Sequence, residues 1–226
     1  MALLRAENIT VVFHIDAVEA HRVLDSVDME VAPGEIVDIV GPSGAGKSTL
    51  LRALAWMNPL ATGTLYLDGV PHTAFSGQAW RSRVTMLPQE PALIGSTISE
   101  ALLIPWQLAI HGDTPAPPPE AMRELLDAAG LADIALDRET ARLSVGQQAR
   151  VAFIRTVLTR PRVLLLDEAD AALDPASASA LSALTARFLE VAEGSAVVRV
   201  RHRETDGLAH RRLRVEGGRI TEEATS

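Results

Sequence analysis

The chain has 226 residues, enough to bury one sizeable hydrophobic core or two small ones. Its net charge of −8 disfavours a general nucleic-acid binder, because such proteins present a basic surface to phosphates. The absence of cysteine excludes disulfides and cysteine-based metal sites. Neither a signal peptide nor a membrane-spanning helix is predicted, since the longest apolar region, 84–110, contains Glu90, Glu100 and three prolines.

The N-terminal part of the chain predicts an antiparallel β unit and then a strand and a helix. Residues 3–13 and 23–31 alternate partly between polar and apolar and are rich in β-branched residues, which favours two strands that end at the turn 32–34. Residues 35–40 have the length and composition of a strand, and residues 50–56 those of a helix.

The stretch Gly41–Thr49, called the phosphate loop below, matches the pattern G-x-x-x-x-G-K-[ST] in full. Its glycines allow positive φ angles, and the helix that follows offers unpaired N–H groups to an anion. We expect Lys47 to reach the β- and γ-phosphates of a nucleotide and the hydroxyl of Ser48 to bind Mg²⁺. The candidate nucleotide ligands are Gly41, Pro42, Ser43, Gly44, Ala45, Gly46, Lys47, Ser48 and Thr49.

The middle of the chain changes from strands to helices. Residues 64–69 and 84–89 predict strands, and the region between about 90 and 160 predicts an inserted, mostly helical part. Its expected helices are 96–110 (broken at Pro105), 120–129 and 144–160. The predicted fold class is therefore α/β, with a nucleotide-binding core and a helical insertion.

The C-terminal part predicts a return to alternating strands and helices. The stretch 162–166 is short and, apart from Arg162, wholly apolar, as a buried parallel strand should be. A helix over 175–193, a strand over 196–200 and a hairpin over 212–220 follow.

Charged residues in this part favour a solvated face of mixed charge. The arginines concerned are Arg199, Arg201, Arg203, Arg211, Arg212 and Arg214, interspersed with Glu204, Asp206 and Glu216. A lone Asp38 inside the apolar strand 35–40 has no explanation in the pattern.

The acidic pair Asp167-Glu168 follows the buried strand 162–166. An Asp at the carboxyl end of such a strand can hold Mg²⁺ beside a phosphate loop, and an adjacent acid can polarise the attacking water. Such a pair is by itself more often only a loop feature, but the phosphate loop upstream favours the functional interpretation.

The segment Leu143–Gln147, called the signature segment below, resembles the signature motif of ATP-binding cassette (ABC) ATPases. Further motifs of that family follow its order along the chain: the phosphate loop, Gln89, the signature segment, Val163–Glu168, Ala172–Pro175 and His202. The resemblance implies one ABC ATPase domain over residues 1–226. It would have a RecA-like P-loop NTPase core, an antiparallel β subdomain and a helical subdomain inserted at about 90–160.

The resemblance also implies ATP and Mg²⁺ as cofactors and assigns catalytic roles to three residues. Glu168 would activate water, Gln89 would contact Mg²⁺ or water, and His202 would sense the γ-phosphate. His210 competes for the last role but lies further along the chain. The implied Mg²⁺ ligands are Ser48, Gln89 and Asp167.

An aromatic residue that stacks on adenine is expected upstream of the phosphate loop. Phe13 is the best-placed candidate, and His14 or His21 could occupy the same region.

The signature segment implies a second copy of the chain as a partner. Ser144 can cap a helix whose N–H groups face an anion, and in the family this segment (Ser144, Val145, Gly146, Gln147) completes the ATP site of the other subunit. Val145 stands where the family usually has glycine, so this half of the site is either a tolerated variant or a weakened one. Asp170 and Arg201 are two further departures from the family pattern.

A separate membrane permease is the other expected partner. The apolar stretch 91–108 corresponds to the groove that receives a permease helix in ABC transporters, although it could be internal core instead. Residues 103–108 are similar to FetA/YbbL-type ATPases of iron export. We therefore expect an ATPase subunit at the cytoplasmic face of the cell membrane, with metal or iron export as a narrower expectation. The alternative is a non-membrane ABC ATPase of DNA repair, translation or regulation, although no nucleic-acid partner is expected from the charge.

Overall fold

A computed structural model describes residues 1–14, 20–171, 173–201 and 206–223. In these ranges the strands form two sheets, a four-stranded one with the order β2-β1-β4-β5 and a six-stranded one with the order β10-β9-β3-β8-β7-β6. The strands are β1 Leu4–His14, β2 Ala20–Val31, β3 Ile36–Val40, β4 Ala61–Leu67, β5 Val70–Pro71, β6 Val84–Leu87, β7 Val163–Asp167, β8 Ala196–Val200, β9 Arg211–Glu216 and β10 Arg219–Glu223.

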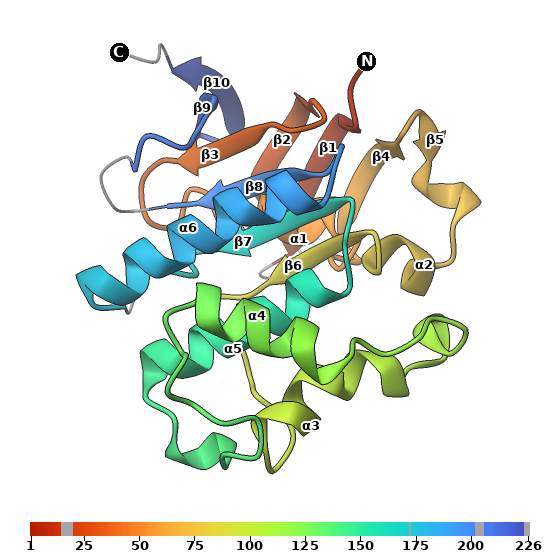
Figure 1. Cartoon of the computed structure of the whole chain (residues 1–226). Coiled ribbons are helices and arrows are strands. Elements are labelled where there is room, and N and C mark those ends of the chain that lie inside the picture. Colours follow the sequence, from red (N-terminus) through yellow and green to blue (C-terminus); the bar gives the residue numbers. More distant parts are fainter. Residues whose placement is uncertain (15–19, 172, 202–205, 224–226) are drawn as a thin grey trace.

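The helices divide between the sheets and a separate lobe. Figure 1 shows α3, α4 and α5 together on one side of the six-stranded sheet, in what we call the helical lobe. The α-helices are α1 Lys47–Leu54, α2 Gly77–Arg81, α3 Ile98–Leu103, α4 Pro119–Ala128, α5 Val145–Leu158 and α6 Pro175–Val191. The 3-10 helices are η1 His72–Ala74, η2 Ile104–Gln107, η3 Ala109–His111 and η4 Thr140–Arg142.

Five strands of the larger sheet run parallel in the order β9-β3-β8-β7-β6. All residues of β7 and β8 are buried, which explains why their sequences, apart from Asp167 and Arg199, are apolar throughout rather than alternating. Because parallel strands end at the same edge of a sheet, the segments that follow β3, β6, β7 and β8 gather at one edge. This edge, called the carboxyl edge below, carries the site.

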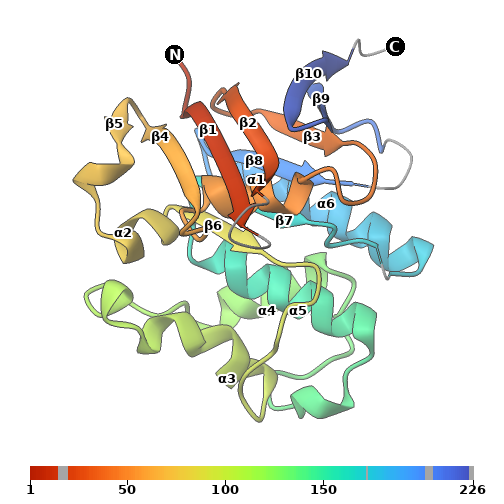
Figure 2. The ribbon, with the colours of Figure 1, turned by 180° about the vertical axis from the view of Figure 1, so that it is seen from behind.

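The antiparallel sheet packs against the core through α1. Leu50, Leu51 and Leu54 of α1 are fully buried between the two sheets, and burial of each such side chain stabilises the fold by about 1.5–3 kcal/mol. Trp80 of α2 is also fully buried, and its indole N–H donates to the carbonyl of Leu54 over 3.0 Å. The view from behind shows α1 next to β1 and β8 (Figure 2).

One hydrophobic cluster joins the helical lobe to α6 and to the six-stranded sheet, and the lobe contributes Ile98, Leu126 and Phe153 to it. The predicted break at Pro105 is real, since α3 ends at Leu103 and the 3-10 turn η2 follows. Pro105 has no N–H to donate, so the hydrogen bonds of the α-helix cannot continue through it and a 3-10 turn takes over. No helix in the described ranges combines the length and the apolar character needed to cross a membrane.

The prediction of a solvated face of mixed charge is wrong for Arg199 and Arg201, whose side chains are 4% and 8% exposed. Arg199 lies opposite Asp38 in the register of β8 and β3, and it donates to both carboxylate oxygens over 2.7 and 3.1 Å. Each of the two residues is the partner that allows the other to be buried, because a buried charge is tolerated only when it is paired. Arg203 and Glu204 lie outside the described residues.

Among the β-strands and α-helices, two small elements were not predicted from the sequence: the two-residue strand β5 and the one-turn helix α2. Ser76 caps α2 by accepting a hydrogen bond from the N–H of Ala79 over 3.1 Å. The stretch is too short for a periodic pattern to stand out, and its tertiary anchor, Trp80, is what holds it.

Candidate nucleotide-binding site

The phosphate loop leaves the core at the end of β3 with a backbone that only glycine allows. Gly41 has a φ of 141°, and a Cβ atom there would lie 2.2 Å from the carbonyl oxygen of Val215. Gly46 has a φ of 100°, and a Cβ atom there would lie 2.8 Å from a methyl carbon of Val23. Both glycines are therefore required by φ and by space, and together they fix the path of the loop.

The helix α1 begins within the last residues of the loop, and its first N–H groups have no side-chain cap because its N-cap is Gly46. This end of a helix attracts anions through its unpaired donors and its dipole. Lys47 is only 4% exposed, and its ammonium donates to the carbonyl oxygens of Gly41 and Pro42 over 3.0 and 2.9 Å. The cation is thus folded back over the cradle that the backbone forms.

Ser48 and Asp167 meet although 119 residues separate them. The hydroxyl of Ser48 donates to Oδ1 of Asp167 over 2.8 Å. Asp167 is 3% exposed, and burial raises the pKa of its carboxyl, against the opposing effect of the Ser48 hydrogen bond. A hydroxyl and a carboxylate side by side beside an anion cradle are the oxygen donors that Mg²⁺ prefers, so these residues fit a nucleotide phosphate with Mg²⁺.

Glu168 directly follows Asp167 at the carboxyl edge, and its φ of 50° lies in the left-handed region. Its N–H donates to the carbonyl oxygen of Val200 on β8 over 3.2 Å. Gln89 lies two residues beyond β6, whose last residue, Leu87, pairs with Leu166 of β7. Gln89 is exposed, and the register places it at the same edge as Glu168.

The histidine expected to sense the γ-phosphate, His202, lies outside the described residues. Its competitor His210 is described, and its Nδ1 accepts a hydrogen bond from the N–H of Ile36 over 3.1 Å. Ile36 begins β3, whereas the phosphate loop follows the end of β3. His210 therefore lies at the opposite edge of the sheet.

Phe13 lies near the end of β1, is 38% exposed and pairs with His21 of β2. The same strand β2 carries Val23, which contacts the phosphate loop at Gly46. The structure thus brings the β1–β2 hairpin beside the loop, and Phe13 and His21 both remain candidates for the adenine contact. The side chain of His14 lies outside the described part of the structure.

The signature segment begins α5 with a capping box that matches the helix cap expected of Ser144. The hydroxyl of Ser144 accepts a hydrogen bond from the N–H of Gln147, whose side chain in turn accepts one from the N–H of Ser144. Val145 is 67% exposed. A Cβ atom on Gly146 would lie 2.8 Å from Oγ of Ser177, so the start of α5 packs closely against the start of α6.

The structure therefore brings together the phosphate loop, Asp167, Glu168 and the segment that carries Gln89, all at the carboxyl edge. The signature segment belongs instead to the helical lobe (Figure 1). A single chain thus holds these two groups of predicted site residues apart from each other.

Sequence reasoning did not foresee the ion pair between Asp170 and Arg201, which joins the turn after Glu168 to the end of β8 over 3.0 Å. A signal was available, because Asp170 and Arg201 are two departures from the family pattern and carry opposite charges. Two unusual charges of opposite sign suggest a contact, which the sequence alone did not place.

Known proteins agree with this arrangement. Residues 24–171 match the family model described as ABC transporter. The chain is 32% identical to the probable iron export ATP-binding protein FetA of Escherichia coli, over 84% of the chain and 81% of FetA. It is 39% identical to the rice protein STAR1 and 36% identical to the Fe(3+) ions import ATP-binding protein FbpC of Streptomyces avermitilis. It spans 51% and 58% of the lengths of these two relatives.

Solved structures give the same result. The dimeric structure of a bacterial ABC transporter cassette superposes with a TM-score of 0.82 at 25% identity, over 97% of both chains. A post-hydrolysis dimer of that cassette bound to ADP and phosphate superposes with a TM-score of 0.80, also at 25% identity and over 97% of both chains. The predicted fold class, a P-loop NTPase core with an antiparallel β subdomain and inserted helices, is confirmed. The chain belongs to the ABC transporter family and is an ABC-type ATPase with ATP and Mg²⁺ as its cofactors.

Proposed function

We propose that the chain is the ATP-hydrolysing subunit of an ABC transporter, that it pairs with a second copy around two ATP molecules, and that it drives a separate membrane permease. The observation that carries the proposal is the junction of Ser48 and Asp167 beside the start of α1, with Glu168 as the next residue. It combines an anion cradle, a metal-binding pair and an acid in one place.

In this proposal each residue at the carboxyl edge has one task. The N–H groups of the phosphate loop and the ammonium of Lys47 bind the β- and γ-phosphates. Ser48, Asp167 and Gln89 hold Mg²⁺, which when bound neutralises charge that develops on the phosphate oxygens. Glu168 accepts a proton from the attacking water.

Two further residues complete the set. His202 senses the γ-phosphate, because it follows β8 in sequence and β8 ends at the carboxyl edge. Phe13 stacks on adenine, supported by its exposure on the hairpin that touches Gly46.

The second half of each site comes from the signature segment of the other copy. The exposed start of α5, with Ser144 to Gln147, offers a second helix N-terminus to the γ-phosphate. The dimeric cassettes that this chain resembles support a dimer, for which we propose a head-to-tail pair with twofold symmetry. Such symmetry makes both copies contribute equally to both sites.

The permease is proposed to dock between the helical lobe and α2. A cavity of about 400 Å³ lies there, and Leu108 and Ile110 at its rim are 56% and 41% exposed. Part of the stretch 91–108 therefore faces solvent rather than the core, as a groove for a partner helix requires. Docking of this kind holds the chain at the cytoplasmic face of the membrane.

Iron is the cargo we propose, and export is the direction. The likeness of residues 103–108 to iron-export ATPases and the identity to FetA support both points. The relatives also include importers such as FbpC, so the direction rests on FetA alone. Cells that lack the chain should accumulate more iron than cells that carry it; unchanged or lower cellular iron refutes export of iron.

The experiment that tests the function uses two variants of the full chain. Lys47→Ala should abolish ATP binding or hydrolysis. Glu168→Gln should keep ATP binding, slow turnover strongly and trap an ATP-dependent dimer, seen by light scattering. Turnover at the wild-type rate in Glu168→Gln contradicts the assignment of the base. Recovery of the chain with ribosomes or DNA, and not with a multi-span membrane protein, contradicts the transporter.

A further inference from the structure

A buried network of charges lies beside the carboxyl edge, on the side of α6. Arg199 holds Asp38 with two hydrogen bonds and Asp206 with two more, at distances of 2.7–3.1 Å. Asp206 also accepts from the hydroxyl of Ser182 on α6 over 2.7 Å. The network thus joins β3, β8 and α6.

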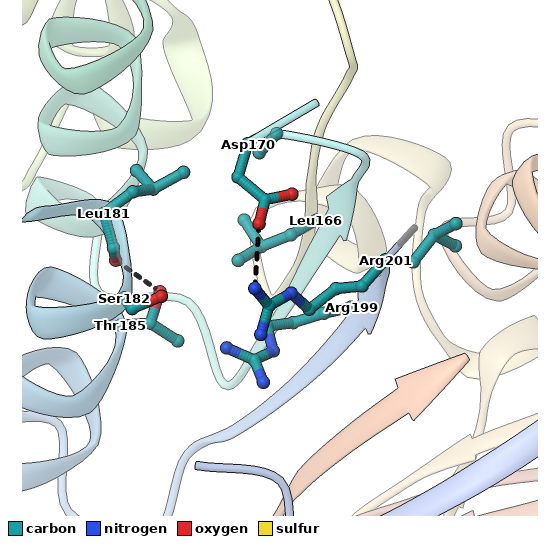
Figure 3. Close-up of a pocket in the computed structure, with 9 residues that line it drawn as sticks. Leu166, Asp170, Leu181, Ser182, Thr185, Arg199 and Arg201 are labelled. Carbon is teal, nitrogen blue, oxygen red and sulfur yellow. Dashed lines mark hydrogen bonds and ion pairs between the residues drawn. The ribbon is translucent and has the colours of Figure 1, made fainter. Parts of the chain in front are cut away.

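Arg201 extends this network to the turn that follows Glu168. Its guanidinium lies 3.0 Å from Oδ2 of Asp170 and 2.8 Å from Oδ2 of Asp206. The side chains of Arg201 and Asp170 are 8% and 10% exposed, so water screens their attraction little. Figure 3 shows the two side chains pointing toward one another, Arg201 from the segment directly after β8 and Asp170 from the turn.

The turn itself needs such support. Glu168 has a φ of 50°, a conformation that costs a residue other than glycine of order 1–3 kcal/mol and persists only where the surroundings impose it. Two hydrogen bonds, called ties below, join this turn to the end of β8. In the first, the N–H of Glu168 donates to the carbonyl oxygen of Val200, and in the second, Arg201 donates to the carboxylate of Asp170. The first tie fixes the backbone before the side chain of Glu168, and the second fixes the turn after it.

We infer that Arg201 is a positioning residue for ATP hydrolysis, which holds Glu168 in its productive orientation through Asp170. The inference rests on the proposed role of Glu168 as the base. Arg201 does not touch the nucleotide in this account, and it acts only through the turn 168–171. Since small misplacements of a catalytic group cost large factors in rate, loss of the tie should appear in kcat rather than in ATP binding.

The test compares Arg201→Gln, Asp170→Asn and the double variant Asp170→Thr/Arg201→Thr in the full chain. Each single variant leaves one charge buried without its partner, whereas the double variant removes both charges. Arg162→Gln is the matched control, because Arg162 pairs with Asp68 at an exposed site. The measurements are kcat and KM for ATP, together with the melting temperature.

We expect each single variant to lose about tenfold or more in kcat, with KM for ATP within about threefold of wild type. The double variant should lose about as much kcat as each single variant, and not the product of the two losses, because either single variant already breaks the contact and the effects of coupled residues are not additive. The Arg162→Gln control should turn over like wild type.

Single variants that are folded and keep the wild-type kcat overturn the inference. So does a double variant that regains the wild-type kcat without the contact, or one that loses as much as the product of the single losses. Glu168→Gln is assayed in parallel: if it alone is inactive while Arg201→Gln is active, the inference fails and the base assignment stands. If Glu168→Gln is active, the proposed function itself fails.

Discussion

Replacement of Gly46 by alanine tests whether the shape of the phosphate loop is set by space as well as by φ. Gly46 has a φ of 100°, and the new Cβ would lie 2.8 Å from Cγ1 of Val23 and 3.2 Å from its carbonyl oxygen. The strained φ costs about 1–3 kcal/mol. The overpacking against β2 adds about 1–3 kcal/mol.

Gly44→Ala is a matched control in the same loop. Gly44 has a φ of 78°, so it carries a similar strain, but nothing lies within 4 Å of a Cβ built there. The difference between the two variants therefore isolates the contact with Val23. We expect Gly46→Ala to be less stable than Gly44→Ala by about 1–3 kcal/mol.

Urea unfolding of the two variants, followed by circular dichroism, measures this difference directly. In a chain of this length each kcal/mol also lowers the melting temperature by about 2–4 °C. Gly46→Ala should in addition bind ATP more weakly than Gly44→Ala, because the cradle must shift away from β2. Equal stability of the two variants would refute the reasoning.

Three other perturbations probe the buried charges and the metal site. Asp38→Asn should lower the free energy of unfolding by about 3 kcal/mol, because it leaves Arg199 with a weakened partner in the core. In acid, wild type should lose stability below about pH 4, whereas Asp206→Asn should lose less; guanidine unfolding between pH 3 and 7 measures both. Removal of Mg²⁺ with EDTA should abolish turnover, and Ser48→Ala should raise the Mg²⁺ concentration for half-maximal turnover about tenfold.

The sign of the acid effect follows from the network. Burial disfavours the charged form of Asp206, but hydrogen bonds from Arg199 and Ser182 outweigh it and hold the pKa of the carboxyl well below its usual value. The charged carboxylate therefore contributes its full stabilisation at pH values above the pKa that Asp206 has in the unfolded chain. This stabilisation is lost as the pH falls toward the lower pKa that Asp206 has in the folded chain. Equal acid profiles for wild type and Asp206→Asn would contradict this.

The other two predictions have their own controls. Asp68→Asn breaks the exposed ion pair with Arg162 and should lower the free energy of unfolding by less than about 1 kcal/mol. If Asp38→Asn costs no more than that, the buried pair is not what stabilises β3 against β8. A wild-type Mg²⁺ requirement in Ser48→Ala would show that this hydroxyl does not bind the metal.

The loop and the helix caps were predictable from the sequence because their physics is local. The phosphate loop can be recognised from its glycines at fixed spacing and from the strand and the helix at its two ends. Ser144 and Gln147 form a capping box whose two members stand three residues apart. In such cases the residues that interact are also near neighbours in the chain.

The buried charges were not predictable, because their partners are far apart in sequence. Asp38 and Arg199 are separated by 161 residues, and only the register of β3 with β8 makes them neighbours. Read alone, Asp38 was an anomaly in a strand, and Arg199 and Arg201 were part of a supposed solvent face. The pairing of Asp170 with Arg201 depends in the same way on β7 lying next to β8.

The most direct test of the central claim, a site completed by a second copy, mixes two inactive variants. Lys47→Ala disables the phosphate loop. Val145→Glu places a negative charge at the signature segment, and the chain tolerates it because Val145 is exposed and an acid suits the first turn of a helix.

Each variant alone should be inactive, since every site in its dimer contains one damaged half. An equimolar mixture should regain about a quarter of the wild-type turnover, because half of the dimers are mixed and each of these holds one intact site. A mixture as inactive as its components, or wild-type turnover by Val145→Glu alone, would contradict the account.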